Sequence, residues 1–206
     1  MQKRLAKMPT VVITNINDIS EDEYNFALTK LNHVKYERVM KYRLYEDKLR
    51  SVAADISAKK AVSQITGKDF NSIEILQDEK GKPYFENIYL SLSHSGDYAI
   101  CAADTLPVGI DIEKIRTNLK NNIARRICTQ EDEKNYLNTG DFFERLIEIW
   151  TVKEACFKAL INQPQVISDI KLNLIEGKLN CEGISSIETK KFKDDYIISI
   201  VIGIKI

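Results

Sequence analysis

Two segments of the chain repeat apolar residues at the spacing of an α-helix. In the first, residues 47–65, Leu49, Val52 and Ile56 recur at intervals of three and four. The second covers residues 141–161 and carries apolar residues at similar intervals. Since each segment is long enough for several turns, we predict two long helices that each bury one apolar face.

Other segments are short and rich in β-branched or alternating apolar residues, which is typical of strands. We expect strands at residues 72–76, 88–93, 98–103 and 108–113. A turn at Ser95-Gly96-Asp97 would join the second and third of these strands. Beyond residue 161, the pattern predicts a strand-rich tail.

The two halves of the chain are similar at a separation of about 98 residues. Three dipeptides match at or near this separation: Lys60-Ala61 with Lys158-Ala159, Asp97-Tyr98 with Asp195-Tyr196, and Gly81-Lys82 with Gly177-Lys178. Three short matches also arise by chance, but the order of helix, strand, Gly-Lys turn and hairpin is shared too. We therefore predict an α+β fold with two similar, pseudo-repeated halves, residues 1–105 and 106–206. Each half would pack a long helix on an antiparallel sheet, and one globular unit would hold its site between the halves.

The charges of the 206-residue chain balance. There are 30 lysines and arginines and 30 aspartates and glutamates, so the formal net charge is +0. A neutral chain lacks the overall field that attracts nucleic acid or an anionic membrane, and we expect neither as a partner. A composition of 44% hydrophobic and 29% charged residues is typical of a globular protein.

Cysteine spacing and the lengths of apolar runs indicate a compartment. The longest apolar run, residues 196–204, is far shorter than the roughly 20 residues that cross a bilayer. No apolar core of a signal peptide follows Met1. The cysteines form no CxxC pair, which argues against a zinc ribbon. We expect a cytoplasmic protein with reduced, mostly buried thiols at Cys101, Cys128, Cys156 and Cys181.

Two carboxylates share one face of the expected strand at residues 108–113. Because side chains alternate along a strand, Asp111 and Glu113 project side by side, and Gly109 leaves space beside them. A solvated polar face explains this hexapeptide on its own. The second long helix adds Glu154, which lies among the apolar residues Phe143, Leu146, Ile147, Trp150, Phe157 and Ile161.

A carboxylate on an apolar helix face needs a compensating charge. Lys158, four residues after Glu154, would supply it through an ordinary intrahelical ion pair. The alternative is that Glu154 joins Asp111 and Glu113 around a divalent cation. Three carboxylates without thiolate or imidazole favour Mg²⁺ or Mn²⁺ over zinc. Since Mg²⁺ in proteins commonly binds substrate phosphates, the acids suggest phosphoryl transfer.

Four motifs together resemble the Sfp-type 4′-phosphopantetheinyl transferases. The strand reads Gly109-Ile110-Asp111-Ile112-Glu113, similar to the family's Gly-x-Asp-x-Glu. The helix reads Trp150-Thr151-Val152-Lys153-Glu154-Ala155-Cys156-Phe157-Lys158, similar to Trp-[Ser/Cys/Thr]-x-Lys-Glu-[Ala/Ser]-x-x-Lys. Upstream, Gly81-Lys82-Pro83 and Ser93-His94-Ser95 resemble the family's Gly-Lys-Pro and Ser-His-Ser motifs. The motifs occur in the family's order over residues 35–160.

The resemblance implies a fold and a reaction. The family joins two similar halves, holds coenzyme A between them and acts as a monomer at this length. It transfers 4′-phosphopantetheine from coenzyme A to a serine of an apo acyl or peptidyl carrier protein and releases 3′,5′-ADP. By the match, Asp111, Glu113 and Glu154 hold Mg²⁺ against the pyrophosphate, and Lys158 contacts the transferring phosphate.

The resemblance also assigns the coenzyme A contacts. His94, preceded by Ser93, matches the histidine at the phosphates, and Lys82 and Pro83 match the stretch beside the adenine. Arg50, Lys35 and Arg38 match basic residues that bind the 3′-phosphate. Without the family, His94 and Lys82 are explained as turn residues, and the basic residues as a solvated helix face.

The predicted general base departs from the family pattern. Members carry an aromatic residue and Ser or Thr shortly before a glutamate, whereas residues 126–133 here lack the aromatic. Glu131 is the chosen base, with Glu133 and a bound water as alternatives.

Residues 114–126 form a candidate partner surface, since their charged side chains are all basic and isoleucines and a leucine are interspersed at helical spacing. We expect this surface to dock an acidic carrier-protein helix, although core isoleucines and solvated charges also explain it. The basic residues are Lys114, Arg116, Lys120, Arg125 and Arg126.

Two alternative functions are considered for the protein as a whole. They are a Mg²⁺-dependent nucleotide or coenzyme A phosphohydrolase and a non-catalytic coenzyme A or carrier-binding module.

Overall fold

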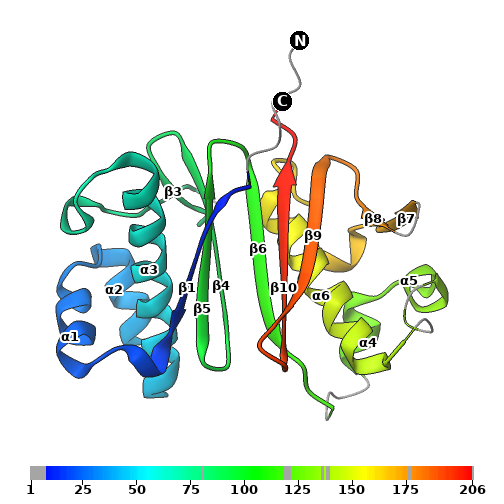
Figure 1. Ribbon diagram of the computed structural model, residues 1–206, viewed down its shortest axis with the longest axis horizontal. Coiled ribbons are helices and arrows are strands. Elements are labelled where there is room, and N and C mark those ends of the chain that lie inside the picture. Colours follow the sequence, from blue (N-terminus) through cyan, green and yellow to red (C-terminus); the bar gives the residue numbers. More distant parts are fainter. Residues whose placement is uncertain are drawn as a thin grey trace.

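The fold is α+β, with two antiparallel sheets side by side and helices on the outer side of each (Figure 1). The architecture comes from a computed structural model that describes residues 8–79, 81–117, 122–135, 137, 140–175 and 178–205. We call the strands and helices up to Asp104 the first half, and those from Val108 onward the second half. Within the described residues no helix is both long and apolar enough to span a bilayer.

The first half consists of a five-stranded sheet in the order β1-β5-β4-β3-β2 and three helices. The strands are β1 (Thr10–Asn15), β2 (Leu76–Gln77), β3 (Pro83–Phe85), β4 (Ile88–Ser95) and β5 (Tyr98–Asp104). The helices are α1 (Glu21–Thr29), α2 (His33–Met40) and α3 (Tyr45–Thr66), with short 3-10 turns at η1 (Ile16–Asp18) and η2 (Phe70–Ser72). α3 packs on the sheet and ends at Gly67, whose positive φ of 71° suits glycine.

The second half has a three-stranded sheet in the order β6-β10-β9 and a separate pair, β7-β8. The strands are β6 (Val108–Lys114), β7 (Asn173–Ile175), β8 (Lys178–Asn180), β9 (Ile184–Phe192) and β10 (Tyr196–Gly203). The helices are α4 (Asn122–Ile127), α5 (Gln130–Asn135) and α6 (Phe142–Ala159), followed by a 3-10 turn, η4 (Ile167–Asp169). Asp141 caps α6 by accepting a hydrogen bond from the backbone N–H of Glu144 at 2.9 Å.

Most predicted elements are present. Both long helices, the three strands between residues 88 and 113 and the strand-rich tail are confirmed. The strand predicted at residues 72–76 is wrong: η2 ends at Ser72, and only Leu76 belongs to a strand. Ile73 and Ile75 are buried in the core below α3 without pairing in a sheet, which explains the misleading apolar alternation.

The buried face of α6 differs from the predicted stripe. Leu146 and Ile147 are buried, but Trp150 and the other aromatic members are partly exposed, and Ile161 lies beyond the helix end. The core face is formed by Val152, Ala155, Cys156 and Ala159, because α6 packs against both β6 and β10. Glu154 is therefore half-buried at the edge of this face and does not lie at its centre.

The described elements repeat at the predicted separation. β5 begins at Tyr98 and β10 at Tyr196, 98 residues later. The residue before each strand accepts an equivalent backbone hydrogen bond: the carbonyl of Asp97 from Ile16 at 2.8 Å, and that of Asp195 from Ile115 at 2.7 Å. One member of the third matching dipeptide, Gly177, lies outside the described residues. The division of the chain between residues 105 and 106 stays a prediction.

A shared core joins the two halves. Ile100 of β5 lies in one buried cluster with Ile110 of β6 and Ile198 of β10. At the end of the sheets, the hydroxyl of Tyr196 accepts a hydrogen bond from the backbone N–H of Asp97 at 3.2 Å. All four cysteines are free thiols, three of them buried and Cys181 partly so.

Candidate functional site

The acidic strand β6 lies between α6 of its own half and β4 of the first half. Its apolar residues face the shared core, as the alternation predicts, so Gly109, Asp111 and Glu113 face the other way. A Cβ at Gly109 would lie 1.8 Å from the backbone oxygen of Ala155. Only glycine therefore lets α6 approach the strand this closely, which brings the side chains of α6 within reach of Asp111.

Asp111 is the most constrained of the three acids. Only 3% of the residue is exposed. Its Oδ1 accepts a hydrogen bond from the Ser93 hydroxyl at 2.6 Å and one from the Lys158 ammonium at 2.7 Å. Its Oδ2 is buried and has no hydrogen-bond partner among the described residues. Since buried polar atoms are normally satisfied, this oxygen is open to a further ligand.

The negative charge of Asp111 acts on both Glu113 and Glu154. Burial and, next, the negative charge of Asp111 raise the pKa of Glu113 to about 7, although a hydrogen bond from Ser95 lowers it. Burial also raises the pKa of Glu154, while Lys158 lowers it and Asp111 raises it. Elevated pKa values in neighbouring carboxyl groups indicate a site where a bound cation would be favoured.

A row of serines from β4 aligns the acidic strand. The hydroxyls of Ser91, Ser93 and Ser95 accept hydrogen bonds from the backbone N–H groups of Ile110, Ile112 and Lys114 at 2.9, 3.4 and 3.2 Å. Ser95 also donates to Glu113 Oε2 at 2.8 Å. The sequence analysis named only Ser93 as a site residue, although the alternation of serine along residues 91–95 was the available signal for all three.

Lys158 reaches across to β6 and does not hydrogen-bond to Glu154. Its ammonium donates to the backbone oxygen of Ile110 at 3.1 Å as well as to Asp111. The simple intrahelical pair with Glu154 is therefore not what the lysine forms. A lysine here supplies a positive charge beside the acids, and this charge is suited to a phosphate that approaches the same point.

The donor set fits an oxygen-ligated divalent cation, although the side chains do not form a closed cage. Among the described residues, no three His, Cys, Asp or Glu side chains are close enough together to hold a metal ion as they stand. Lys158 and Ser93 occupy one oxygen of Asp111, and Ser95 occupies one of Glu113. The unpartnered Oδ2 of Asp111 and the raised pKa values of the two glutamates show which groups would gain from a cation.

Basic residues of the first half gather beside His94. Loss of solvent around the imidazole lowers the pKa of His94, and the positive charges of Lys35, Arg50 and Lys158 lower it further. Arg50 donates to the backbone oxygen of Gly96 at 2.8 Å and pairs with Asp47. The structure thus brings Lys35 of α2 and Arg50 of α3 close to His94 of β4.

Lys35 is a buried cation whose ammonium is bonded to no described residue. Only 8% of it is exposed, and no hydrogen bond or ion pair to its ammonium is found in the described part of the chain. Burial and, next, the positive charge of Arg38 lower the pKa of Lys35 to about 8, although the charge of Asp55 raises it. Arg38, by contrast, is exposed on the same helix. A desolvated, unpaired ammonium is suited to binding an anion.

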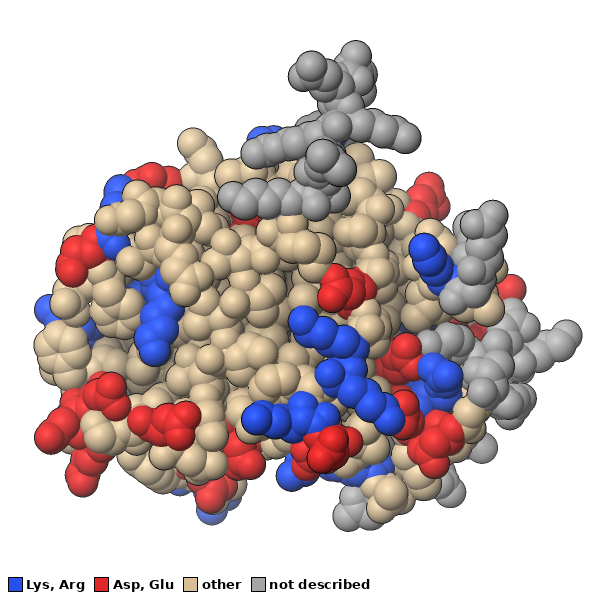
Figure 2. All heavy atoms as spheres, in the orientation of Figure 1, with Lys and Arg blue, Asp and Glu red and all other residues tan. Residues whose placement is uncertain are grey.

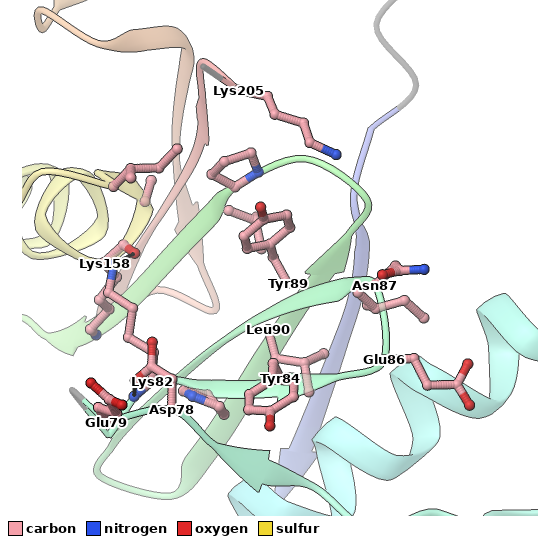
Figure 3. Close-up of a pocket in the computed structure, with 16 residues that line it drawn as sticks. Asp78, Glu79, Lys82, Tyr84, Glu86, Asn87, Tyr89, Leu90, Lys158 and Lys205 are labelled. Carbon is pink, nitrogen blue, oxygen red and sulfur yellow. Dashed lines mark hydrogen bonds between the residues drawn. The ribbon is translucent and has the colours of Figure 1, made fainter.

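Lys82 and Pro83 lie at a hollow of about 650 Å³ that opens between the halves. In Figure 3, Lys82 and Lys158 lie on one side of this hollow, with Tyr84 and Tyr89 across from them. The Lys82 ammonium is directed at α6, where it donates to backbone oxygens. Lys158 is thus shared between this hollow and the acidic site.

Glu131 lies apart from the acids. It is exposed and lines a different hollow with residues of α6 and the β7-β8 pair, and none of Asp111, Glu113 and Glu154 lines it. The side chain of Glu133 lies outside the described residues. Asp132, the residue between the two glutamates, points inward. Its Oδ2 accepts hydrogen bonds from Thr129 and from the buried Lys153, the latter at 2.6 Å.

The Asp132–Lys153 pair was missed by the sequence analysis. Lys153 is fully buried and also donates to the backbone oxygen of Ile127 at 2.9 Å, so it ties α4 and α5 to α6 beside Glu154. The available signal was Thr129-x-x-Asp132, the pattern of a helix cap, which marks Asp132 as the inward-facing acid. The choice of Glu131 as the base stays a prediction without a supporting contact.

The predicted partner surface is only partly described. Lys114 pairs with Asp195 at 3.0 Å, and Arg116 and Arg126 are exposed. Lys120 and the side chain of Arg125 lie outside the described residues. Figure 2 shows lysines and arginines gathered on one face near the turn where β9 ends and β10 begins, with acidic residues among them.

Comparisons with known proteins agree with the motifs. A family model described as "4'-phosphopantetheinyl transferase superfamily" matches residues 107–201, and one described as "4'-phosphopantetheinyl transferase, N-terminal" matches residues 18–106. The two matches adjoin each other near the boundary between the two halves.

Individual relatives carry the same description. The chain is 28% identical to the 4′-phosphopantetheinyl transferase gsp of Aneurinibacillus migulanus, over 70% of this chain and 62% of that protein. It is also 28% identical to the 4′-phosphopantetheinyl transferase Sfp of Bacillus subtilis, over 68% of this chain and 64% of that protein. The matches therefore span less than two thirds of the length of these relatives.

A solved structure of holo-[acyl-carrier-protein] synthase from Thermotoga maritima is also similar. It is 21% identical, and the similarity covers 48% of this chain and 64% of that one with a TM-score of 0.40.

Proposed function

The chain belongs to the 4′-phosphopantetheinyl transferase superfamily, and we propose that it transfers 4′-phosphopantetheine from coenzyme A to a serine of an apo acyl or peptidyl carrier protein. One observation carries the proposal. Asp111 is buried beside two glutamates of raised pKa. One of its oxygens is held by Lys158 and Ser93, and the other has no partner among the described residues. Such an acidic centre beside a lysine is suited to phosphoryl transfer.

The proposed reaction exchanges one bond to phosphorus for another. The serine hydroxyl oxygen of the carrier bonds to the β-phosphorus of coenzyme A, and the bond from that phosphorus to the bridging oxygen breaks. 3′,5′-ADP leaves with the electron pair of the broken bond. The serine proton passes to a general base, for which Glu131, Glu133 and a bound water remain the predicted alternatives.

The residues of the second half act on the reacting phosphates. Asp111, Glu113 and Glu154 would hold Mg²⁺ or Mn²⁺, which when bound neutralises charge on the pyrophosphate. Lys158, already directed at Asp111, binds the transferring phosphate. Because Lys158 and Asp111 hold each other in the free protein, the site is oriented before the substrate arrives.

The residues of the first half hold the rest of coenzyme A. Lys35, Arg50 and His94 bind phosphates, with Arg38 at the exposed edge, and the turn at Lys82–Pro83 lies beside the adenine. The strongest support for this part of the proposal is Lys35, a buried residue whose ammonium is bonded to none of the described residues. We propose a monomer that acts in the cytoplasm and docks an acidic carrier helix near Lys114 and Arg126.

Intact-mass spectrometry tests the proposal. The protein is incubated with coenzyme A, Mg²⁺ and a panel of apo acyl and peptidyl carrier proteins. We expect at least one carrier to gain the mass of one phosphopantetheine, and the same carrier with its acceptor serine replaced by alanine to gain none. If no carrier is modified, the proposal fails. Phosphate or nucleotide release from coenzyme A without a carrier would instead indicate a hydrolase.

A further inference from the structure

The C-terminal end of α6 is held by a side chain from the other half of the molecule. The last carbonyl groups of any helix have no partner within the helix. Here the Lys82 ammonium donates hydrogen bonds to the backbone oxygens of Lys158, at 3.2 Å, and Leu160, at 2.8 Å. A cation in this place is also favoured by the helix dipole.

The turn that carries Lys82 is itself fixed. The backbone N–H of Lys82 donates to the Asp78 side chain at 2.8 Å, and its backbone oxygen accepts from the N–H of Asp78 at 2.9 Å. Gly81 permits the turn because its φ is 78°, a conformation that other residues rarely adopt. The ammonium is therefore presented to α6 from an ordered base.

The backbone that Lys82 holds belongs to a residue of the proposed active site. The same Lys158 whose carbonyl accepts from Lys82 extends its own ammonium to Asp111 Oδ1 at 2.7 Å. α6 ends one residue later, at Ala159, where helices readily fray. A displacement of this last turn would carry Lys158 away from Asp111.

We propose that Lys82 is a positioning residue: it binds the last carbonyls of α6 across the boundary between the halves and so fixes Lys158 against Asp111. This inference rests on the proposed function, because Lys158 matters only if phosphoryl transfer occurs beside Asp111. It revises the expectation from the family resemblance, in which Lys82 serves the ligand. Its ammonium serves the helix end, and only Pro83 of the pair is left to lie beside the adenine.

Kinetics of Lys82→Met and Lys82→Arg test the role on the carrier that the wild-type protein modifies. We expect Lys82→Met to lower kcat about tenfold while KM for coenzyme A stays within twofold, since loss of a charged hydrogen bond is typically a tenfold effect. Lys82→Arg should recover most of kcat because arginine retains the charge and the donors. Lys205→Met is the matched control: Lys205 is an exposed lysine that lines the same hollow, and its loss should change neither constant.

Hydrogen exchange separates this inference from the proposed function. In Lys82→Met, the backbone amides of Lys158, Ala159 and Leu160 should exchange about tenfold faster than in the wild type, and those of Lys205→Met should not change. This result is expected whether or not a carrier is modified. A rise in KM for coenzyme A with unchanged kcat, or unchanged exchange in Lys82→Met, would overturn the positioning role.

Discussion

The first half of the molecule carries a valine and a threonine where the second half carries two acids. The pairing of the strands shows which residues correspond. Val12 pairs with Cys101, and Asp111 pairs with Ser199, which lies 98 residues after Cys101, so Asp111 is the counterpart of Val12. By the same register Thr14, opposite Ala99, is the counterpart of Glu113, opposite Ile197. The halves share a scaffold but differ at the positions where the proposed chemistry occurs.

The environments of these counterparts explain the difference. Val12 packs into the apolar cluster below α3. Thr14 hydrogen-bonds to Ser57 at 2.7 Å, which satisfies both buried hydroxyls within the half. Asp111 and Glu113 instead accept from Ser93 and Ser95 of the other half. In the first half, the residues at these positions are satisfied by contacts within the half. In the second half, the two acids are buried between strand and helix and receive their hydrogen bonds from serines of the first half.

Removing the charge of Asp111 should have the largest effect. Asp111→Asn keeps the shape but leaves the site with one carboxylate fewer, and we expect kcat/KM for transfer to fall about a thousandfold. Steady-state kinetics with a modified carrier measures this. Asp195→Asn, which removes a partly exposed acid that pairs with Lys114 at one end of the same sheet, should change activity less than twofold. Equal losses in the two variants would contradict the assignment of Asp111.

The buried lysines of the two long helices offer a second comparison. Lys153→Met leaves the buried charge of Asp132 uncompensated, and we expect the free energy of unfolding to fall by about 4 kcal/mol. Lys59→Met, in the first half, should cost less because Asp55 keeps Lys35 as a neighbouring cation. Urea denaturation measures both. A smaller loss for Lys153→Met than for Lys59→Met would show that the Asp132 pair is not what ties α5 to α6.

Gly109 provides the next test, because its counterpart Thr10 carries a full side chain. Gly109→Ala would place a methyl group against the backbone oxygen of Ala155, so we expect a loss of about 3 kcal/mol in the free energy of unfolding. Thr10→Ala should cost less than about 1 kcal/mol. Thermal unfolding of both variants checks the order. A neutral Gly109→Ala would mean that α6 does not need its close approach to β6.

The smallest expected effect concerns Lys35 and pH. With a pKa of about 8, lowered by burial and by Arg38, Lys35 loses its charge between pH 7 and 9 in the free protein. The charged form binds phosphate, so affinity for 3′,5′-ADP should fall up to about tenfold over this range, with proton uptake on binding at pH 8.5. The groups that face Lys35 are Arg38, Asp55 and His94.

Lys35→Arg is the control for this pH dependence, because arginine stays charged throughout the range. Calorimetry in buffers of different ionisation enthalpy should show that the variant binds 3′,5′-ADP without proton uptake. A wild-type affinity that is constant from pH 7 to 9 would exclude Lys35 from the phosphate site.

Local patterns predicted much of the fold and part of the site. The periodicity around Leu49 and the alternation around Asp111 are properties of neighbouring residues, and both led to correct elements. The alternation at Ile73 and Ile75 was misleading because two isoleucines can enter a core from an irregular segment. A pattern of apolar residues therefore predicts which residues are buried more reliably than it predicts whether their segment pairs in a sheet.

Contacts between distant segments could not be predicted from such patterns. Lys153 meets Asp132 only because α5 folds back on α6, and Lys82 meets the end of α6 only because the halves pack together. The buried face of α6 differs from the predicted apolar stripe for the same reason, because the helix packs against two strands and its burial is not confined to one face. Each of these features depends on the relative placement of elements that lie far apart in the chain.

Equilibrium binding of Mn²⁺ tests most directly whether the acids that distinguish the second half form a cation site. In the presence of coenzyme A, the wild-type protein is expected to bind one Mn²⁺ per chain, and Asp111→Asn to bind it at least tenfold more weakly, while Asp195→Asn binds like the wild type. Equal Mn²⁺ affinity in wild type and Asp111→Asn, or no binding by the wild type, would contradict the assignment of Asp111, Glu113 and Glu154 as the metal-binding residues.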